Sequence, residues 1–158
     1  MAALNAAKDR SHDLDGRLTV SDEIARLRRT LPATLCPDWL AELLQTVPIV
    51  GCDFELAEDQ DASELGVEMR FLSVDDMIDE ATEAYPGIAA HRLGYLPVGA
   101  CLTGSGDYYY LDLRKPGDDD PPFVRLPHGA VDGESYREDE IEIVAVSLSA
   151  FIRAATID

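Results

Sequence analysis

The chain has 158 residues, of which 46% are hydrophobic and 28% are charged, and its formal net charge is −18. This length fits one domain of ordinary size, and the balance of apolar and charged residues is typical of a globular protein. A surface this negative repels phosphate backbones and anionic lipid headgroups, so we expect binding neither to nucleic acid nor to a membrane.

The acidic excess lies in the part of the chain that is expected to fold. Residues 1–36 carry six basic and five acidic residues, whereas residues 37–158 carry seven and 26, a net charge of −19. Such a charge favours solubility or the fast capture of a basic partner, and both interpretations stay open. No apolar run is long enough for a membrane span or a secretory signal. The three cysteines show no disulfide or metal-binding spacing, so we expect buried, reduced thiols in a cytoplasmic protein.

Residues 1–18 are small, polar and aperiodic, which predicts a flexible leader before a single domain at residues 19–158. Caps and apolar periodicity predict helices that begin near Ser21 (capped by Thr19 with Asp22), at Pro37, after Ser73 and after Ser147. The first three are expected to end at Pro32, Pro48 and Pro86-Gly87. Strands are predicted at 49–56, 66–72, 96–103, 107–113, 123–126 and 141–146. Helices, then strands, then a closing helix indicate an α+β fold.

Two acidic loops are candidate partner-binding segments. Six acids lie between Asp53 and Glu64, among them Asp59 and Asp61, and no base accompanies them. Asp118, Asp119 and Asp120 precede two prolines, which predicts a solvated hairpin loop whose carboxylates meet an arginine-rich partner. No metal site is expected there, because consecutive carboxylates alternate in direction and the calcium-loop pattern is absent.

The run Tyr108-Tyr109-Tyr110 is expected to lie on a strand, where side chains alternate between two faces. Leu111 and Leu113 assign the side of Tyr109 to the core, which leaves Tyr108 and Tyr110 at or near the surface. Exposed tyrosines are favoured interface anchors, so both are candidate partner contacts. The alternative, that both pack beneath a neighbouring helix, is equally open.

The sequence predicts no catalytic, metal or cofactor site. Gly104-Ser105-Gly106 lacks the Lys-Ser/Thr ending of a phosphate-binding loop and precedes a strand, so it predicts a hairpin turn. No serine or cysteine lies in a nucleophile-elbow sequence, and no histidines have ligand spacing. A dyad of Cys101 with His128 stays open, because the sequence does not show how far apart they lie.

Several short segments, taken in order and spacing, carry a family resemblance over residues 30–153. They are Leu31-Pro32 before the Trp39 helix, Leu96-Pro97-Val98-Gly99, Gly104 to Asp112, Pro122-Phe123-Val124 with His128, and Val144 to Ile152. Together they resemble the SUKH superfamily, the group around yeast cell-wall-synthesis regulators and many bacterial immunity proteins. Ala150 departs from the pattern, because an acidic residue often stands there. The resemblance implies a mostly antiparallel central sheet flanked by helices, a short C-terminal helix and no established catalytic residues.

The resemblance further implies an immunity protein that binds and neutralises the effector domain of a toxin. Many such domains are nucleases with basic clefts, which an acidic surface could block. The expected contacts are the loop of Asp118, Asp119 and Asp120, the loop of Asp59 and Asp61, and Tyr108 with Tyr110. The alternative is a regulatory or scaffold module of the same family without a toxin partner.

Overall fold

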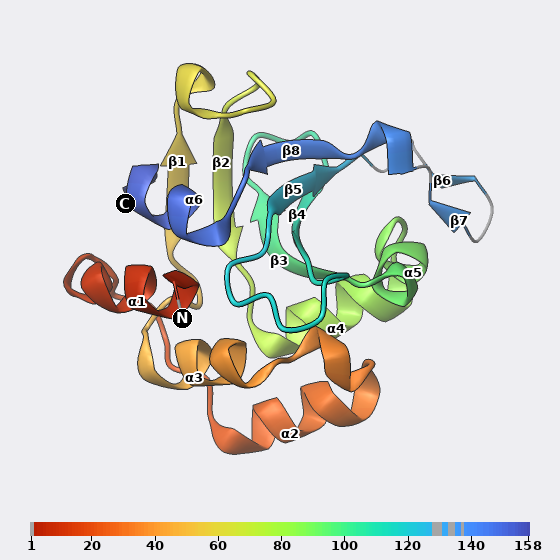
Figure 1. Cartoon of the computed structure of the whole chain (residues 1–158), viewed down its shortest axis with the longest axis horizontal. Coiled ribbons are helices and arrows are strands. Elements are labelled where there is room, and N and C mark those ends of the chain that lie inside the picture. The colour runs from red at the N-terminus through yellow and green to blue at the C-terminus, as the bar shows by residue number, and fades with distance from the viewer. Residues whose placement is uncertain (1, 128–130, 133–134, 137) are drawn as a thin grey trace.

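The computed structural model describes residues 2–127, 131–132, 135–136 and 138–158 (Figure 1). Its α-helices are α1 (Ala2–Asp9), α2 (Ser21–Thr30), α3 (Asp38–Thr46), α4 (Val74–Glu83), α5 (Gly87–Ala90) and α6 (Leu148–Ala154). The main strands are β1 (Asp53–Leu56), β2 (Val67–Phe71), β3 (Tyr95–Cys101), β4 (Tyr108–Asp112), β5 (Phe123–Leu126), β8 (Glu142–Ala145) and β9 (Thr156–Ile157). A separate two-stranded ladder joins β6 (Val131–Asp132) to β7 (Ser135–Tyr136).

The seven main strands form one sheet in the order β8-β5-β4-β3-β2-β1-β9, and every neighbouring pair is antiparallel. The sheet curls, so that β1 and β2 stand apart in direction from β5 and β8 (Figure 1). Helices lie against the sheet. Helix α6 is the last of them in the sequence, and the short edge strand β9 follows it. The predicted α+β fold with an antiparallel sheet and a short C-terminal helix is therefore confirmed.

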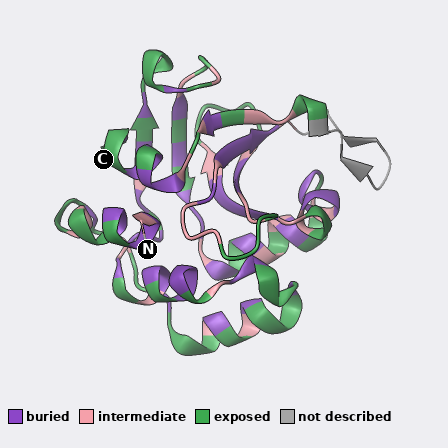
Figure 2. Ribbon diagram, viewed as in Figure 1, coloured by how far each residue is buried: buried purple, intermediate pink, exposed green. Residues whose placement is uncertain are grey.

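Two hydrophobic clusters cover the two faces of the central strands. Leu96, Tyr109 and Leu111 belong to the large cluster, which also contains the buried residues of α1, α2, α3, α4 and α6. Tyr95 and Tyr110, their neighbours along the same strands, belong to a smaller cluster with the alanines of α5. Because adjacent strand residues point to opposite faces, strands β3 and β4 are buried on both sides. Figure 2 shows this as continuous burial along the middle of the sheet.

The N-terminal segment differs from the expected flexible leader, because residues 2–9 form helix α1. Its small apolar residues Ala3, Leu4, Ala6 and Ala7 are buried, and the helix packs on α6 and α3. Just beyond it, the guanidinium of Arg10 donates hydrogen bonds to the carbonyls of Ile152 and Ala155 at the end of α6. Such basic capping satisfies carbonyls that the helix itself leaves open. The prediction of an unstructured segment is thus wrong for residues 2–9.

Local signals predicted helices α2, α3, α4 and α6 close to their observed positions. The hydroxyl of Ser73 accepts a hydrogen bond from the amide of Asp76 at 3.2 Å, and that of Ser147 accepts from Ala150 at 3.2 Å, as N-caps do. Helix α2 begins at Ser21 as predicted, but the carboxylate of Glu23 caps it by accepting from the amide of Val20 at 3.1 Å.

Helix α4 ends at Glu83, close to Pro86-Gly87 as predicted, but a further short helix that was not predicted, α5, begins at Gly87. A Cβ at Gly87 would lie 1.9 Å from the carbonyl oxygen of Glu80, so only glycine allows α5 to approach α4 this closely. This approach brings the alanines of α5 over the central strands.

Candidate functional site

The loop of Asp118, Asp119 and Asp120 is part of the fold rather than a solvated hairpin tip. All three residues are half-buried. The carboxylate of Asp120 accepts hydrogen bonds from the amide and hydroxyl of Ser149 at 2.8 and 2.6 Å, which fixes the loop to the first turn of α6. The indole of Trp39 donates to the carbonyl of Asp118 at 3.2 Å. The expectation of a solvated loop is wrong, because the hydrogen bonds of Asp118 and Asp120 attach the loop to α3 and α6.

The three tyrosines of β4 differ in their surroundings, and Tyr110 follows the alternative left open, that it packs beneath a helix. Tyr109 is buried in the large cluster as predicted. Tyr110 is 0% exposed and packs beneath α5, so it is not a surface residue. The alternation argument failed because a helix covers the second face of the strand as well. Tyr108 is half-buried and keeps an exposed part.

The two candidate aspartates of the first acidic loop also differ from each other. Asp59 is exposed in a 3-10 turn at Glu58–Gln60. Asp61 is only 3% exposed, and it forms an ion pair with Arg125 at 3.3 Å. Its carboxylate also accepts hydrogen bonds from the amide and hydroxyl of Ser63, both at 2.7 Å. Asp61 therefore stabilises its own loop.

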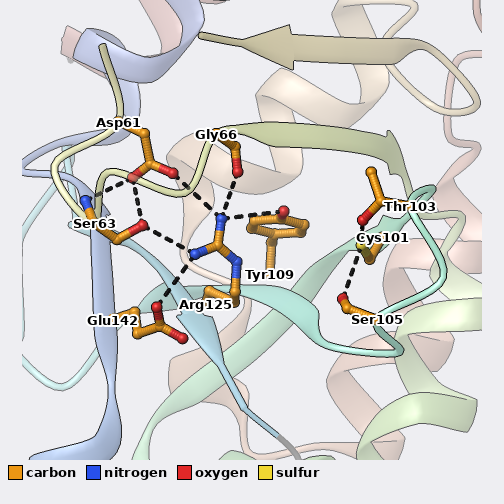
Figure 3. A network of polar contacts seen from close by, with 9 residues as sticks. All are labelled: Asp61, Ser63, Gly66, Cys101, Thr103, Ser105, Tyr109, Arg125 and Glu142. Atoms are coloured by element: carbon orange, nitrogen blue, oxygen red, sulfur yellow. Dashed lines mark hydrogen bonds and ion pairs between the residues drawn. The ribbon is translucent and has the colours of Figure 1, made fainter. Parts of the chain in front are cut away.

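Arg125 is the centre of a buried polar network that sequence reasoning did not find (Figure 3). Its guanidinium is 6% exposed and donates to groups on three segments of the chain. The acceptors are Asp61 (3.3 Å), Ser63 (3.0 Å), the carbonyl of Gly66 (2.8 Å), the hydroxyl of Tyr109 (3.4 Å) and Glu142 (3.5 Å). A buried arginine with its donors satisfied holds these segments in one arrangement. The network holds the loop around Asp59 to the central sheet.

One acidic feature of the surface is a cleft beside α4, which we call the acidic cleft. It measures about 450 Å³, and strands β2, β3 and β4 form its other wall. Its charged lining comprises Asp76, Asp79, Glu80, Glu83 and Arg70.

Arg70 does not balance these acids, because its guanidinium forms a two-bonded ion pair with Asp53 at 2.7 and 3.0 Å. Tyr108 also lines the cleft. One of the expected contact residues thus lies beside four carboxylates of one helix. These carboxylates were not among the predicted contacts, although their spacing along one side of a predicted helix indicated that they share an acidic face.

The electrostatics of the acidic cleft are governed first by burial. Burial raises the pKa of Glu80 to about 7. Burial also raises the pKa of Tyr108, and the negative charges of Glu80 and Asp76 raise it further. Both shifts show that the cleft disfavours additional negative charge. A cation entering it would pair with these carboxylates.

Cys101 lies next to the Arg125 network, at the end of β3 (Figure 3). Its sulfur is 3.0 Å from the hydroxyl of Thr103 and accepts from the hydroxyl of Ser105 at 3.1 Å. Burial alone would raise the pKa of this thiol, but the hydrogen bonds from Ser105 and Thr103 outweigh it and the pKa is lowered. Cys36 and Cys52 are buried as expected, whereas Cys101 is half-buried. His128, its partner in the open dyad, lies outside the described residues.

Within the described ranges, no group of three or more histidine, cysteine or carboxylate side chains is arranged to hold a metal ion. None of the helices in those ranges combines the length and the apolar character that a bilayer crossing requires.

Comparison with protein families matches residues 21–154 to the SMI1/KNR4 family, SUKH-1. The match runs from the start of α2 to the end of α6, so it contains the acidic cleft, the Arg125 network and six of the seven strands of the main sheet. Neither the curated proteins nor the solved structures gave a significant match. Since the matched segment covers most of the chain and agrees with the resemblance seen in the sequence, the protein belongs to the SMI1/KNR4 (SUKH-1) family.

Proposed function

We propose that this chain is a non-enzymatic protein-binding domain, and specifically an immunity protein that neutralises the effector domain of a toxin. Members of its family are generally immunity or regulatory proteins without enzymatic activity. The observation that carries the proposal further is the acidic cleft, where four carboxylates of α4 gather beside Tyr108. A cytoplasmic site of action is part of the proposal, in keeping with three cysteines that form no disulfide.

The chemistry of the acidic cleft favours a basic partner. Lysine or arginine side chains entering the cleft would pair with its carboxylates. Tyr108 offers a ring and a hydroxyl at the edge of the same cleft, as hot-spot tyrosines do. Bound in this way, the domain would place negative charge in the basic cleft that a nuclease effector uses for its substrate.

Not all of the expected contact residues contribute equally to this proposal. Asp59 and Tyr108 keep exposed surface and remain direct contacts. Asp61 and Tyr110 are buried, so they act by holding their segments in place. The carboxylates of Asp118, Asp119 and Asp120 stay a secondary contact, because Asp120 already caps α6.

The test starts from the gene neighbourhood. A toxin gene directly upstream supplies the partner, whose effector domain is then co-expressed with this chain. Wild-type protein should rescue growth, and its association rate should fall steeply between about 50 and 500 mM salt. The double variant Asp76→Asn/Asp79→Asn should bind about tenfold more slowly at low salt.

The matched control is Asp9→Asn/Asp22→Asn, which removes the same charge from exposed positions outside the cleft. It should leave the association rate nearly unchanged. Equal rates for the two double variants, or binding that is insensitive to salt, would refute the role of the cleft.

The second candidate function is a regulatory or scaffold module of the same family. It is favoured if the gene lies in an operon without a toxin. It also predicts a captured partner whose activity in the cell does not harm growth.

A further inference from the structure

A second groove has a charge opposite to that of the rest of the molecule, and we call it the cationic groove. It measures about 600 Å³ and lies between the α2–α3 connection, the turn His91–Leu93 and the β4–β5 loop. It shares no lining residue with the acidic cleft. The two features therefore offer separate binding surfaces.

The charged lining of this groove is mainly basic, in a chain whose net charge is −18. Arg92, Arg114 and Lys115 line it, and the single acid among the lining residues is Asp118. One carboxylate oxygen of Asp118 is already used, because it accepts from the amide of Asp120 at 2.9 Å. Among the described side chains, none forms an ion pair with Lys115, which is exposed.

Arg114 is held at the wall of the groove by its neighbours. Its guanidinium pairs with Asp112 at 2.9 Å and lies 4.9 Å from the centre of the Tyr95 ring. A Cβ at Gly94, where φ is +105°, would lie only 2.8 Å from Cγ of Arg114. The close approach of the two segments therefore requires glycine at this position.

The rest of the lining is largely apolar. Trp39, Leu113 and Leu93 contribute, together with three prolines. Leu93 is 40% exposed, and an exposed leucine beside a tryptophan and several prolines is a suitable place for an apolar anchor. The groove combines a hydrophobic floor with a cationic rim, which is the pattern that binds an amphipathic acidic segment.

We propose that the cationic groove binds a short segment of a partner protein in which acidic side chains flank an apolar or aromatic residue. The apolar residue packs against Leu93 and Leu113, and the carboxylates pair with Lys115 and Arg92. Since Lys115 is exposed and forms no ion pair with a described side chain, the rim keeps cationic charge to offer such a ligand. This surface is distinct from the acidic cleft and selects a partner of the opposite charge.

The test is a selection of random short peptides without tryptophan on the immobilised full chain, with the enriched peptides then labelled for fluorescence anisotropy. Acidic residues should flank an apolar position in the enriched peptides. Trp39 is the single tryptophan of the chain, so its fluorescence reports directly on the groove and should change on binding. The variants Lys115→Glu and Arg92→Glu should each weaken binding by about tenfold or more.

Two controls separate this proposal from the function proposed above. Arg153→Glu makes the same charge change on α6 and lines neither surface, so it should leave peptide binding unchanged. Asp76→Asn/Asp79→Asn should also leave peptide binding unchanged, although it slows binding of a basic partner.

Several outcomes would overturn the proposal. The first is a selection that enriches no acidic consensus. The second is that the enriched peptides bind Lys115→Glu as tightly as the wild type. The third is that an oligonucleotide competes for the groove as well as the peptide does. Concentration-dependent dimers of the wild-type chain that disappear in Lys115→Glu would instead show that a second copy fills the groove.

Discussion

Replacing Arg125 by methionine should destabilise the protein severely. The side chain of Asp61 is 0% exposed and that of Arg125 is 6% exposed, so water cannot take the place of the missing cation. Removing one partner of a buried ion pair costs about 3–5 kcal/mol, because it leaves an uncompensated charge. In a chain of 158 residues this corresponds to a fall of about 10 °C in the unfolding midpoint.

Urea unfolding at neutral pH, followed by the fluorescence of Trp39, measures this loss. The matched control is Arg70→Met, since Arg70 pairs with Asp53 at 2.7 Å but the two side chains are 55% and 29% exposed. An exposed pair of this kind contributes about 1 kcal/mol or less.

The double variant Arg125→Met/Asp61→Leu should recover much of the lost stability, because neither charge then remains buried alone. A loss below about 1 kcal/mol for Arg125→Met, or no recovery in the double variant, would show that the network does not hold the loop to the sheet.

Three other predictions concern the N-terminal helix, the acidic cleft and the free thiol. Leu4→Ala should lower the free energy of unfolding by about 2–4 kcal/mol in chemical denaturation, because Leu4 is only 2% exposed. Burial favours the neutral carboxyl of Glu80 and raises its pKa from 4.5 to about 7. The free energy of unfolding of the wild type therefore falls as the pH rises from 4.5 through about 7. Glu80→Gln should therefore gain stability over wild type between pH 5 and 8, whereas a constant difference would contradict the shift. Cys101 should react with iodoacetamide faster than the two buried cysteines, and Ser105→Ala should slow it, as peptide mass spectrometry would show.

The parts of the fold that the sequence predicted are those with strong local signals. Helix α4 has a serine cap, acids in the first turn and an apolar stripe, and it was placed within two residues of its observed ends. Helix α1 was not predicted, because alanines supply most of its buried face. Alanines give a weak hydrophobic periodicity, so the buried face of the helix is hard to recognise in the sequence. Its burial comes from α6, which lies at the other end of the sequence.

The candidate site was harder to predict, because its geometry depends on contacts between distant segments. Asp120 caps a helix 29 residues later, and Arg125 pairs with an acid 64 residues earlier. No local pattern marks either residue as buried. The two alternatives for Tyr110 stayed open for a related reason, since alternation along a strand identifies one core face only when the other face meets solvent. Tyr108 kept exposed surface because it lies at the start of its strand, beside the acidic cleft.

The position of α6 has a consequence for the nascent chain. The ring of Phe151 on this helix stacks on Phe123 at 4.2 Å and lies 5.8 Å from Phe54, while β9 adds to β1. The main core is therefore completed only when Phe54, Phe123 and Phe151 meet, and contacts between such distant segments form slowly. A nascent chain that has not yet reached α6 would leave the rings of Phe54 and Phe123 without this partner and open to chaperones.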